Sequence, residues 1–329
     1  MKKTGMVLWA AVMTAVWGLS GCGGSVGTGN LEKETVVLSE AVVNEVTEKE
    51  KQETDDEKRK AEQGSESDMV ILAVSFGTSF NDNRENTIGA VEKAIAKEYP
   101  EYEVRRAFTS QMIIDILKKR DGLAIDNVTE ALDRAVADGF RRLVVQPTHL
   151  MNGLEYEDMV ATLEEYDEYF DTIVVGEPLL TSDEDFKAVV KAITMDTKDY
   201  DNGETAIVYM GHGTEAESNQ IYGKMQETLM QAGFENYYIG TVEAEPTLED
   251  VRKALKEKGG YKKVVLVPLM VVAGDHANND MARDEEDSWK TIFAADGYEV
   301  ECLLQGLGEL EAIQQIYVDH VRIAVNKQK

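Results

Sequence analysis

Between Met69 and the C-terminus, short apolar runs alternate strictly with longer amphipathic segments. The runs are rich in Val, Ile and Leu, which is typical of strands buried on both faces, and the longer segments have the apolar spacing of helices. The predicted strands are Met69–Phe76, Glu103–Ala107, Arg142–Gln146, Thr172–Val175, Thr205–Met210, Tyr237–Val242, Lys262–Val267 and Glu299–Leu303. The predicted helices are Glu85–Glu98, Val128–Asp138, Glu155–Tyr166, Asp183–Ile193, Ser218–Ala232, Thr247–Lys258, Asp284–Phe293 and Leu310–Val325. Strict alternation of strand and helix indicates an α/β fold built on parallel sheets.

The predicted strands could form one barrel or two small sheets, and an internal repeat in the sequence favours two sheets. Ile71–Thr78 resembles Ile207–Thr214, so that Phe76 in the first copy stands where His212 stands in the second. Leu143–His149 likewise resembles Leu266–Met270, and there the histidine belongs to the first copy. We therefore predict two similar Rossmann-like lobes with parallel sheets, over residues 69–200 and 201–329, with the active-site cleft between them.

The N-terminus has the pattern of an export signal. Lysines follow Met1, an apolar stretch runs from Met6 to Leu19, and small residues precede Cys22, which predicts a signal peptide over residues 1–22. The ending Leu19-Ser-Gly-Cys22 resembles the lipobox of bacterial lipoproteins. This resemblance implies lipid on Cys22 and an exported protein anchored on the outer side of the cytoplasmic membrane. A plain secretory signal or membrane anchor is the alternative.

Residues 23–68 are rich in Gly and Ser and then in mixed charge with many Glu. Such a segment has too little apolar surface to offset the entropy of ordering it, so we predict a disordered acidic linker. The whole chain has a formal net charge of −28, which argues against nucleic acid as a partner because phosphates require clustered Lys and Arg.

Candidate ligands follow several of the predicted strands. His149, Glu177 and His212 each come just after an apolar run, beside glycine or proline. Carboxyl ends of parallel strands carry the chemistry of open α/β sheets, and two imidazoles with one carboxylate are a common donor set for a first-row divalent ion. These residues therefore predict a metal site. The alternative is a structural or merely exposed role for each histidine and a solvated carboxylate for Glu177.

The other two histidines receive different predictions. His276 lies in the polar loop Ala273–Met281, where Asp275 is expected to orient its imidazole. The orientation would suit a residue that transfers protons or that supports the metal ligands without binding the ion itself. A capping loop without chemistry is the alternative. His320 falls within the last predicted helix beside Asp319, and we expect it at the surface.

Short sequence blocks that follow one another along the chain extend the prediction of a metal site. They are Ser75–Ser79, Arg106–Ser110, Arg120–Gly122, Asn152–Gly153, Glu155–Glu157, Met210–Gly213, Val272–Met281, Asp287–Lys290 and Gly306–Glu309. From about Met69 onward the chain resembles the anaerobic sirohydrochlorin cobaltochelatases of cobalamin synthesis, the CbiK family. The resemblance implies the class II chelatase fold, with a tetrapyrrole cleft between its lobes, and a lyase that inserts cobalt(II) into sirohydrochlorin.

The resemblance also implies roles for individual residues. Members of that family hold cobalt with two histidines and, in some, a glutamate, and the implied ligands are His149, Glu177 and His212. The ring loses two pyrrole protons as the ion enters, so His149 and His212 are also the predicted proton acceptors. Glu155, Glu157, Asp275 and His276 are predicted outside the ligand set. No nucleotide is expected, because Gly211-His-Gly213 lacks the spacing of a phosphate-binding loop.

Two questions stay open at this stage. Co²⁺, Fe²⁺ and Ni²⁺ all suit the donor set, with cobalt(II) implied as the substrate metal and iron(II) as the main alternative. Cobalamin precursors are made in the cytoplasm, so an exported copy also fits a surface protein that binds haem, another tetrapyrrole or metal for uptake, or a plain metallochaperone. Whether the chain forms a homo-oligomer is also left open.

Overall fold

The computed structural model describes residues 68–327. The predicted signal peptide, Cys22 and nearly all of the predicted linker lie outside the described residues. Within the described part of the chain, no helix is both long enough and apolar enough to cross a membrane.

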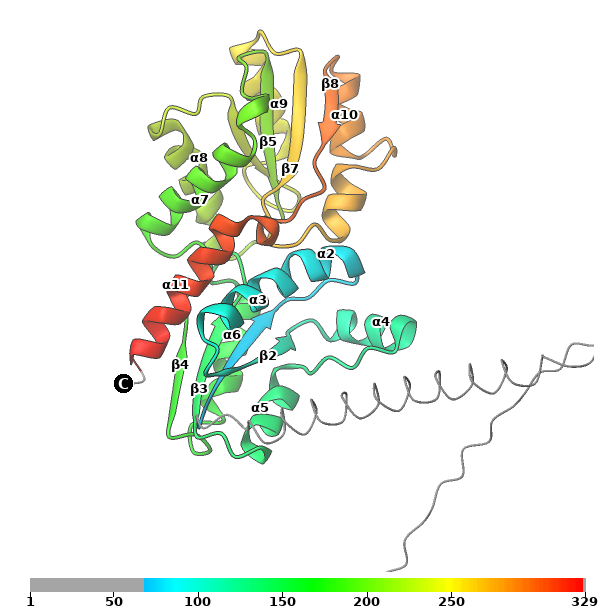
Figure 1. The fold of residues 1–329 in the computed structure, drawn as a ribbon. Coiled ribbons are helices and arrows are strands. Elements are labelled where there is room, and N and C mark those ends of the chain that lie inside the picture. Colours follow the sequence, from blue (N-terminus) through cyan, green and yellow to red (C-terminus); the bar gives the residue numbers. More distant parts are fainter. Residues whose placement is uncertain (1–67, 328–329) are drawn as a thin grey trace, which may run out of the picture. The chain divides into compact units, whose positions relative to one another are not determined.

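All strands within residues 68–327 belong to two four-stranded parallel sheets, as the alternation of elements predicts. The first sheet has the order β2-β1-β3-β4, and the second has the equivalent order β6-β5-β7-β8 (Figure 1). The strands are β1 Met69–Ser75, β2 Glu103–Phe108, β3 Arg142–Pro147, β4 Thr172–Val175, β5 Thr205–Gly211, β6 Tyr237–Thr241, β7 Lys263–Pro268 and β8 Glu299–Cys302. The prediction of an α/β fold with two parallel sheets is confirmed.

The register of the strands confirms the internal repeat. Val74 of β1 pairs with Pro147 of β3, and Met210 of β5 pairs with Pro268 of β7. His149 and Met270 each stand two residues beyond their proline, so they occupy equivalent places in the two lobes.

Helices connect the strands and cover both sheets. They are α2 Asn81–Asn86, α3 Ile88–Glu98, α4 Gln111–Asp121, α5 Val128–Ala137, α6 Leu154–Glu164, α7 Asp183–Asp196, α8 Gln220–Gln231, α9 Leu248–Lys258, α10 Trp289–Ala295 and α11 Glu311–Lys327, with a short π-helical turn at Ala277–Met281. The sequence patterns did not predict α2 and α4. The first is short and polar, and the second begins after Ser110, whose side chain accepts a hydrogen bond from the backbone N–H of Ile113.

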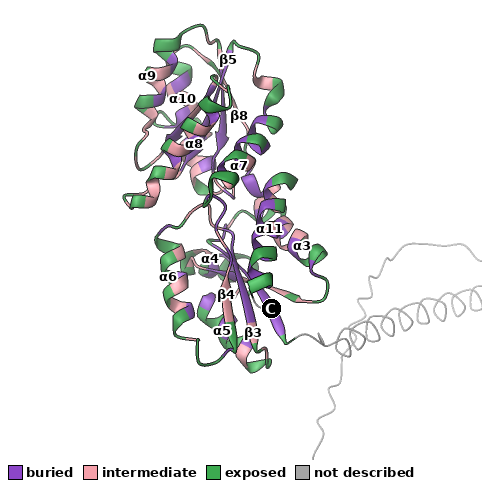
Figure 2. Cartoon of the chain, turned by 90° about the vertical axis from the view of Figure 1, so that its left-hand side faces the viewer, coloured by how far each residue is buried: buried purple, intermediate pink, exposed green. Residues whose placement is uncertain are grey.

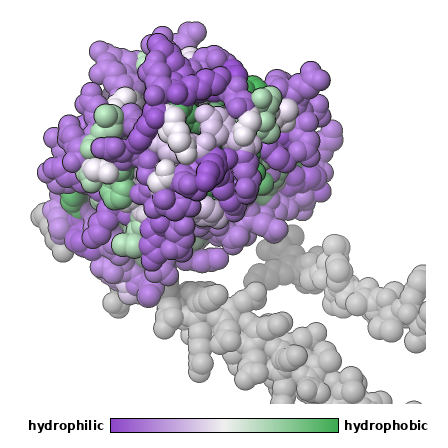
Figure 3. Space-filling model, turned by 90° about the horizontal axis from the view of Figure 1, so that it is seen from above, coloured by the Kyte–Doolittle hydropathy of each residue, from purple (hydrophilic) through white to green (hydrophobic). Residues whose placement is uncertain are grey.

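Alternate residues of the central strands enter different apolar cores. Val70 and Leu72 pack under α5 and α6, and Ala206 and Val208 pack under α9 and α10. The intervening residues of these strands face the other side of each sheet. Met69 and Ile71 of β1 and Ile207 and Tyr209 of β5 enter one shared core with α3, α7, α8 and α11. Figure 2 shows the buried strands, with exposed residues on the outer faces of the helices. The face seen in Figure 3 is mainly hydrophilic, with small apolar patches.

Helix α11 is the last element of the chain but packs on the first sheet. It contacts α3, β3 and β4 as well as α7. Its Tyr317 is fully buried and donates its hydroxyl hydrogen to the carbonyl oxygens of Thr148 (3.0 Å) and His149 (3.2 Å). The end of β3 is thereby fixed by a residue far away in the sequence.

The prediction that His320 lies at the surface is wrong. His320 is only 6% exposed, because α11 is covered by the first sheet and by α7. Its Nδ1 lies 2.9 Å from the carbonyl oxygen of Glu177, and its Nε2 lies 3.0 Å from Oδ1 of Asp185. This histidine therefore connects α11, α7 and the loop after β4.

Replacing Tyr317 by Phe is expected to lower the free energy of unfolding by about 1 kcal/mol, because the carbonyl oxygen of Thr148 loses its hydrogen-bond donor. The carbonyl oxygen of His149 keeps the N–H of Leu179. Chemical denaturation of the domain from residue 68 onward would measure this loss. Tyr169→Phe is the matched control, since Tyr169 is 57% exposed and should leave stability unchanged. Equal stabilities of the two variants would contradict the role given to Tyr317.

Candidate metal centre

Three neighbouring strands of the second sheet end in side chains that can bind a metal ion. His212 follows β5, Glu243 follows β6, and His276 lies in the loop after β7. One ligand atom from each residue lies within 4.8 Å of the others. We call these three residues the strand-end cluster. Parallel strands place their carboxyl ends at one edge of the sheet, which is why residues far apart in sequence meet here.

The turn that presents His212 requires glycine on both sides. A Cβ atom at Gly211 would lie 2.2 Å from Cε1 of Tyr222. Gly213 has a φ of +87°, and a Cβ atom there would lie 2.8 Å from the backbone nitrogen of Ala244. The Gly-His-Gly sequence therefore allows β5 to end in a tight turn directly under the imidazole.

Backbone hydrogen bonds bring Glu243 next to His212. The N–H of Glu243 donates to the carbonyl oxygen of His212 at 2.9 Å. The side chains also converge, with Nε2 of His212 and Oε2 of Glu243 3.5 Å apart. The rings of His212 and His276 have centroids 4.5 Å apart.

A carboxylate orients His276, but it is not the predicted one. Nδ1 of His276 lies 2.7 Å from Oδ2 of Asp280, four residues later. Asp275 instead accepts a hydrogen bond from Nδ2 of Asn279, so the prediction that Asp275 orients the imidazole is wrong. The helical turn places residues four apart on one side, whereas the adjacent residue points elsewhere. With Nδ1 donating to Asp280, Nε2 of His276 keeps a free lone pair for a metal ion.

The strand-end cluster has the chemistry and the exposure of an exchangeable metal site. The side chains of His212, Glu243 and His276 are 44%, 55% and 32% exposed, so an ion can reach them from solvent. Two imidazoles and one carboxylate suit Co²⁺ or Fe²⁺ and leave coordination positions open for a second ligand.

His149 lies at the end of β3, in the first sheet. Both of its ring nitrogens are shielded from solvent and have no hydrogen-bond partner among the described residues. Burial lowers the pKa of His149 to about 4, so the imidazole is neutral at pH 7. The structure does not include His149 in the strand-end cluster, and its role as a ligand stays a prediction.

Glu177 and the acidic residues of α6 also lie outside the strand-end cluster. The backbone carbonyl of Glu177 accepts hydrogen bonds from Gln146 Nε2 and from His320, and its side chain is half-buried. Glu155 and Glu157 are exposed in the first turn of α6. The predicted metal-binding role of Glu177 is therefore not tested by these contacts.

Sequence reasoning missed Glu243, although the signal that selected Glu177 was present. Glu243 follows the predicted strand Tyr237–Val242 directly, just as Glu177 follows Thr172–Val175. Applying the strand-end criterion to the strand that pairs with β5 would have found it.

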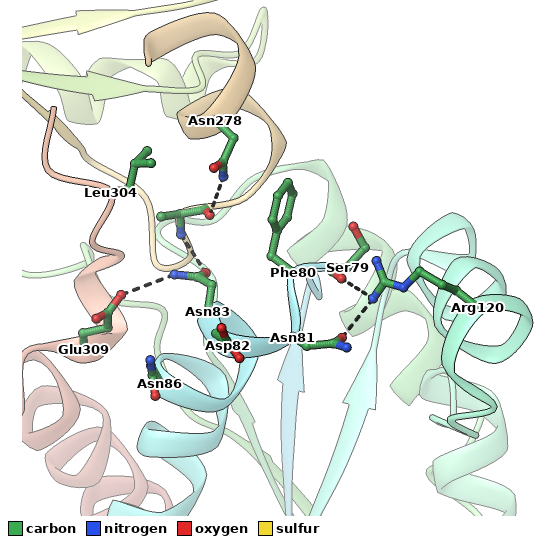
Figure 4. A pocket seen from close by; sticks show the side chains of 11 residues that line it. Ser79, Phe80, Asn81, Asp82, Asn83, Asn86, Arg120, Asn278, Leu304 and Glu309 are labelled. Carbon is green, nitrogen blue, oxygen red and sulfur yellow. Dashed lines mark hydrogen bonds between the residues drawn. The ribbon is translucent and has the colours of Figure 1, made fainter. Parts of the chain in front are cut away.

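A pocket of about 450 Å³ lies beside the loop that carries His276 (Figure 4). Asn83 of α2 connects its two sides: its Oδ1 accepts from the backbone N–H of Ala273 at 2.9 Å, and its Nδ2 donates to Oε1 of Glu309 at 3.3 Å. Asn278 donates to the carbonyl oxygens of Ala273 (3.2 Å) and Gly274 (2.7 Å). The pocket wall and the His276 loop are thus one hydrogen-bonded unit.

The sequence and the fold of this chain are similar to those of known proteins. A family model described as cobalt chelatase (CbiK) matches residues 69–326. Sirohydrochlorin cobaltochelatase of Salmonella typhimurium is 38% identical over 257 residues, which cover 78% of this chain and 96% of that protein. Sirohydrochlorin cobaltochelatase CbiKC of Nitratidesulfovibrio vulgaris is 32% identical over 261 residues, which cover 78% and 90%. The solved structure of SirB from Bacillus subtilis with Fe³⁺ has a TM-score of 0.57 at 14% identity, covering 79% of this chain and 97% of that one, and shares the fold.

Replacing Asp280 by Asn is expected to weaken Co²⁺ binding about tenfold, because the carboxylate that fixes the orientation and tautomer of His276 is lost. Anaerobic titration with Co²⁺, followed by the visible absorption bands of the bound ion, would measure the affinity. Asp275→Asn is the matched control and should bind Co²⁺ like the unmodified chain. Similar losses in both variants would show that Asp280 has no special role.

Proposed function

Since the chain belongs to the cobalt chelatase (CbiK) family, we propose that it catalyses the insertion of Co²⁺ into sirohydrochlorin, a step of cobalamin biosynthesis. It is accordingly an enzyme that forms nitrogen–metal bonds. The match includes every strand of both sheets and the whole strand-end cluster. The two-lobed chelatase fold implied by the sequence resemblance is the observed fold.

The observation that carries this proposal is the strand-end cluster beside a pocket. His212, Glu243 and His276 offer two imidazole nitrogens and one carboxylate from three adjacent strand ends. The loop that carries His276 also supplies Ala273 and Asn278 to the wall of the pocket. A ring that reaches from this pocket to the cluster would meet an ion held there without a diffusional search.

The same three residues supply acceptors for the protons that the ring must release. Sirohydrochlorin loses two N–H protons as its nitrogens bind the ion. Each bond that the ion breaks to the protein frees a lone pair on an imidazole or a carboxylate, and that lone pair can take a pyrrole proton. Exposure of the cluster to solvent lets the protons leave afterwards.

Exposed apolar side chains support a flat ring as the substrate. Phe80 and Leu304 line the pocket and are 36% and 46% exposed. Figure 4 shows them at the pocket with Asn83 and the loop of Asn278 between them. Phe76, at the place equivalent to His212, is also 46% exposed. Large apolar groups at a pocket are stabilised when a ligand ring covers them.

The proposed substrate metal is cobalt(II), with iron(II) as a second candidate. The relatives' names specify cobalt, and the donor set itself binds Fe²⁺ by the same chemistry. His149 and Glu177 remain candidate ligands from the sequence resemblance, whereas the geometry favours Glu243 and His276 as partners of His212.

Anaerobic metallation of sirohydrochlorin with Co²⁺ tests the reaction and the ligand set together. Replacing His212 or His276 by Ala is expected to reduce the rate at least about a hundredfold, because transition-state metal contacts are lost. His149→Ala should keep most of the activity if the strand-end cluster holds the ion. The visible spectrum of the ring, recorded with Co²⁺ and separately with Fe²⁺, measures insertion.

Two results would change the proposal. Loss of activity in His149→Ala with full activity in His276→Ala would favour the ligands implied by the sequence resemblance. Insertion by the unmodified chain that never exceeds the protein-free rate would remove the chelatase function.

The N-terminal sequence favours a second candidate function and a location. We propose that the protein is exported and anchored by lipid on Cys22, on the outer side of the cytoplasmic membrane. Such a location fits a surface protein that binds haem, another tetrapyrrole or metal for uptake, with little chelatase activity.

Replacing Cys22 by Ser is expected to move the full-length protein from the membrane fraction to the soluble extracytoplasmic fraction, because the lipid attachment residue is lost. Cell fractionation with detection of the folded domain would measure this. Ser20→Ala, which keeps a small residue before Cys22, is the control and should stay membrane-bound. Retention of Cys22→Ser in the membrane would argue for an uncleaved anchor.

A further inference from the structure

Two arginines from different elements converge at one end of the pocket. Oδ1 of Asn81 accepts a hydrogen bond from Nη1 of Arg84 at 2.8 Å and another from Nη2 of Arg120 at 2.9 Å. Arg84 belongs to α2 and Arg120 to α4. One neutral amide oxygen thus holds two guanidinium groups close together, although like charges repel each other.

Arg84 is buried and incompletely paired. It is 4% exposed, and its Nε has no hydrogen-bond partner among the described residues. The carboxylate of Glu85 lies 3.9 Å from that Nε and is itself 53% exposed. A buried guanidinium without a close carboxylate raises the positive potential around it.

Arg120 brings this positive charge to the pocket surface. Its Nη2 donates to the carbonyl oxygen of Ser79 at 2.6 Å. Its Nε and Nη2 also donate to the two carboxylate oxygens of Asp121, at 2.8 Å and 2.6 Å. The hydrogen bonds from Arg120 hold the pKa of Asp121 below its usual range. None of the hydrogen bonds that Arg120 makes to described residues uses Nη1, and its side chain is 47% exposed.

Charge is distributed unevenly along the pocket. Arg120 is the only positively charged residue among the described residues that line it, whereas Asp82 and Glu309 are its lining carboxylates. Arg84 lies behind Arg120, and the carboxylates nearest to these two guanidiniums are Asp121, paired with Arg120, and Glu85, 3.9 Å from Nε of Arg84. Figure 4 shows Arg120 at the opposite end from Glu309, whose carboxylate is occupied by Asn83 and by the N–H of Gly306. The Arg120 end therefore attracts an anion in a chain whose net charge is −28.

We propose that Arg120, held by Asn81 with Arg84 behind it, binds a carboxylate arm of the tetrapyrrole. This inference rests on the proposed function, because it assumes a ring with acetate and propionate arms. The Nε and Nη2 donors of Arg120 already pair with Asp121, and its Nη1 is left to donate to a carboxylate from the pocket side. With the ring nitrogens at the strand-end cluster, a carboxylate bound at Arg120 fixes the rotation of the ring in the pocket.

The alternative is a purely structural role, in which Arg120 attaches the end of α4 to the loop at Ser79. Both roles predict some loss of stability when Arg120 is replaced. Only the binding role predicts a change in affinity that depends on the carboxylate arms of the ligand.

The test is a metal-free fluorescence titration of the full chain in detergent buffer with uroporphyrin, which carries acetate and propionate arms, and with its methyl ester in the same buffer. Arg120→Gln is expected to raise the Kd for uroporphyrin about tenfold and to leave the Kd for the ester unchanged. Arg120→Lys should give a smaller rise. Arg141→Gln is the matched control, because Arg141 is exposed, pairs with Asp171 and lies outside the pocket lining.

Steady-state metallation supplies a second readout. In Arg120→Gln the KM for sirohydrochlorin should rise about tenfold, while the KM for Co²⁺ stays the same. Equal Kd values of Arg120→Gln and the unmodified chain for uroporphyrin, or the same change for acid and ester, would overturn the inference. The titration needs no catalysis, so a chain that binds uroporphyrin through Arg120 but inserts no metal would refute the proposed function alone.

Discussion

The packing of both sheets onto one shared apolar core determines where the chemistry of this protein lies. Residues of one parity in β1 and β5 enter the same cluster, together with α3, α7, α8 and α11. Because alternate residues of β1 and β5 enter cores on opposite faces of the sheets, both strands are buried on both faces. Their carboxyl ends lead into loops. The loop of His276 and helix α2 meet through the hydrogen bond from the N–H of Ala273 to Oδ1 of Asn83.

The strands and the repeat were predictable because they depend on local patterns. A buried β-branched run such as Ile71–Val74 is visible in the sequence. The likeness of Ile71–Thr78 to Ile207–Thr214 predicted two similar lobes, and their sheets have equivalent strand orders. Helix α2 was not predictable in the same way, since its polar residues have no apolar period and its position depends on contacts with another part of the chain.

The candidate site was only partly predictable, because it depends on which strands are neighbours. His212 was identified from its strand end, but its partners come from β6 and β7, the two strands that pair with β5. Glu177 and His149 follow strands of the other sheet. The burial of His320 likewise depends on the return of α11 to the first sheet, and the contact of His276 with Asp280 depends on a helical turn that capping patterns do not show.

The position of α11 also has a consequence for the order in which the molecule forms. A ribosome releases the first sheet long before residues 311–327, yet α11 covers β3 and β4, and Tyr317 satisfies the carbonyl groups at the end of β3. The first lobe therefore cannot complete its core until the last helix has been synthesised.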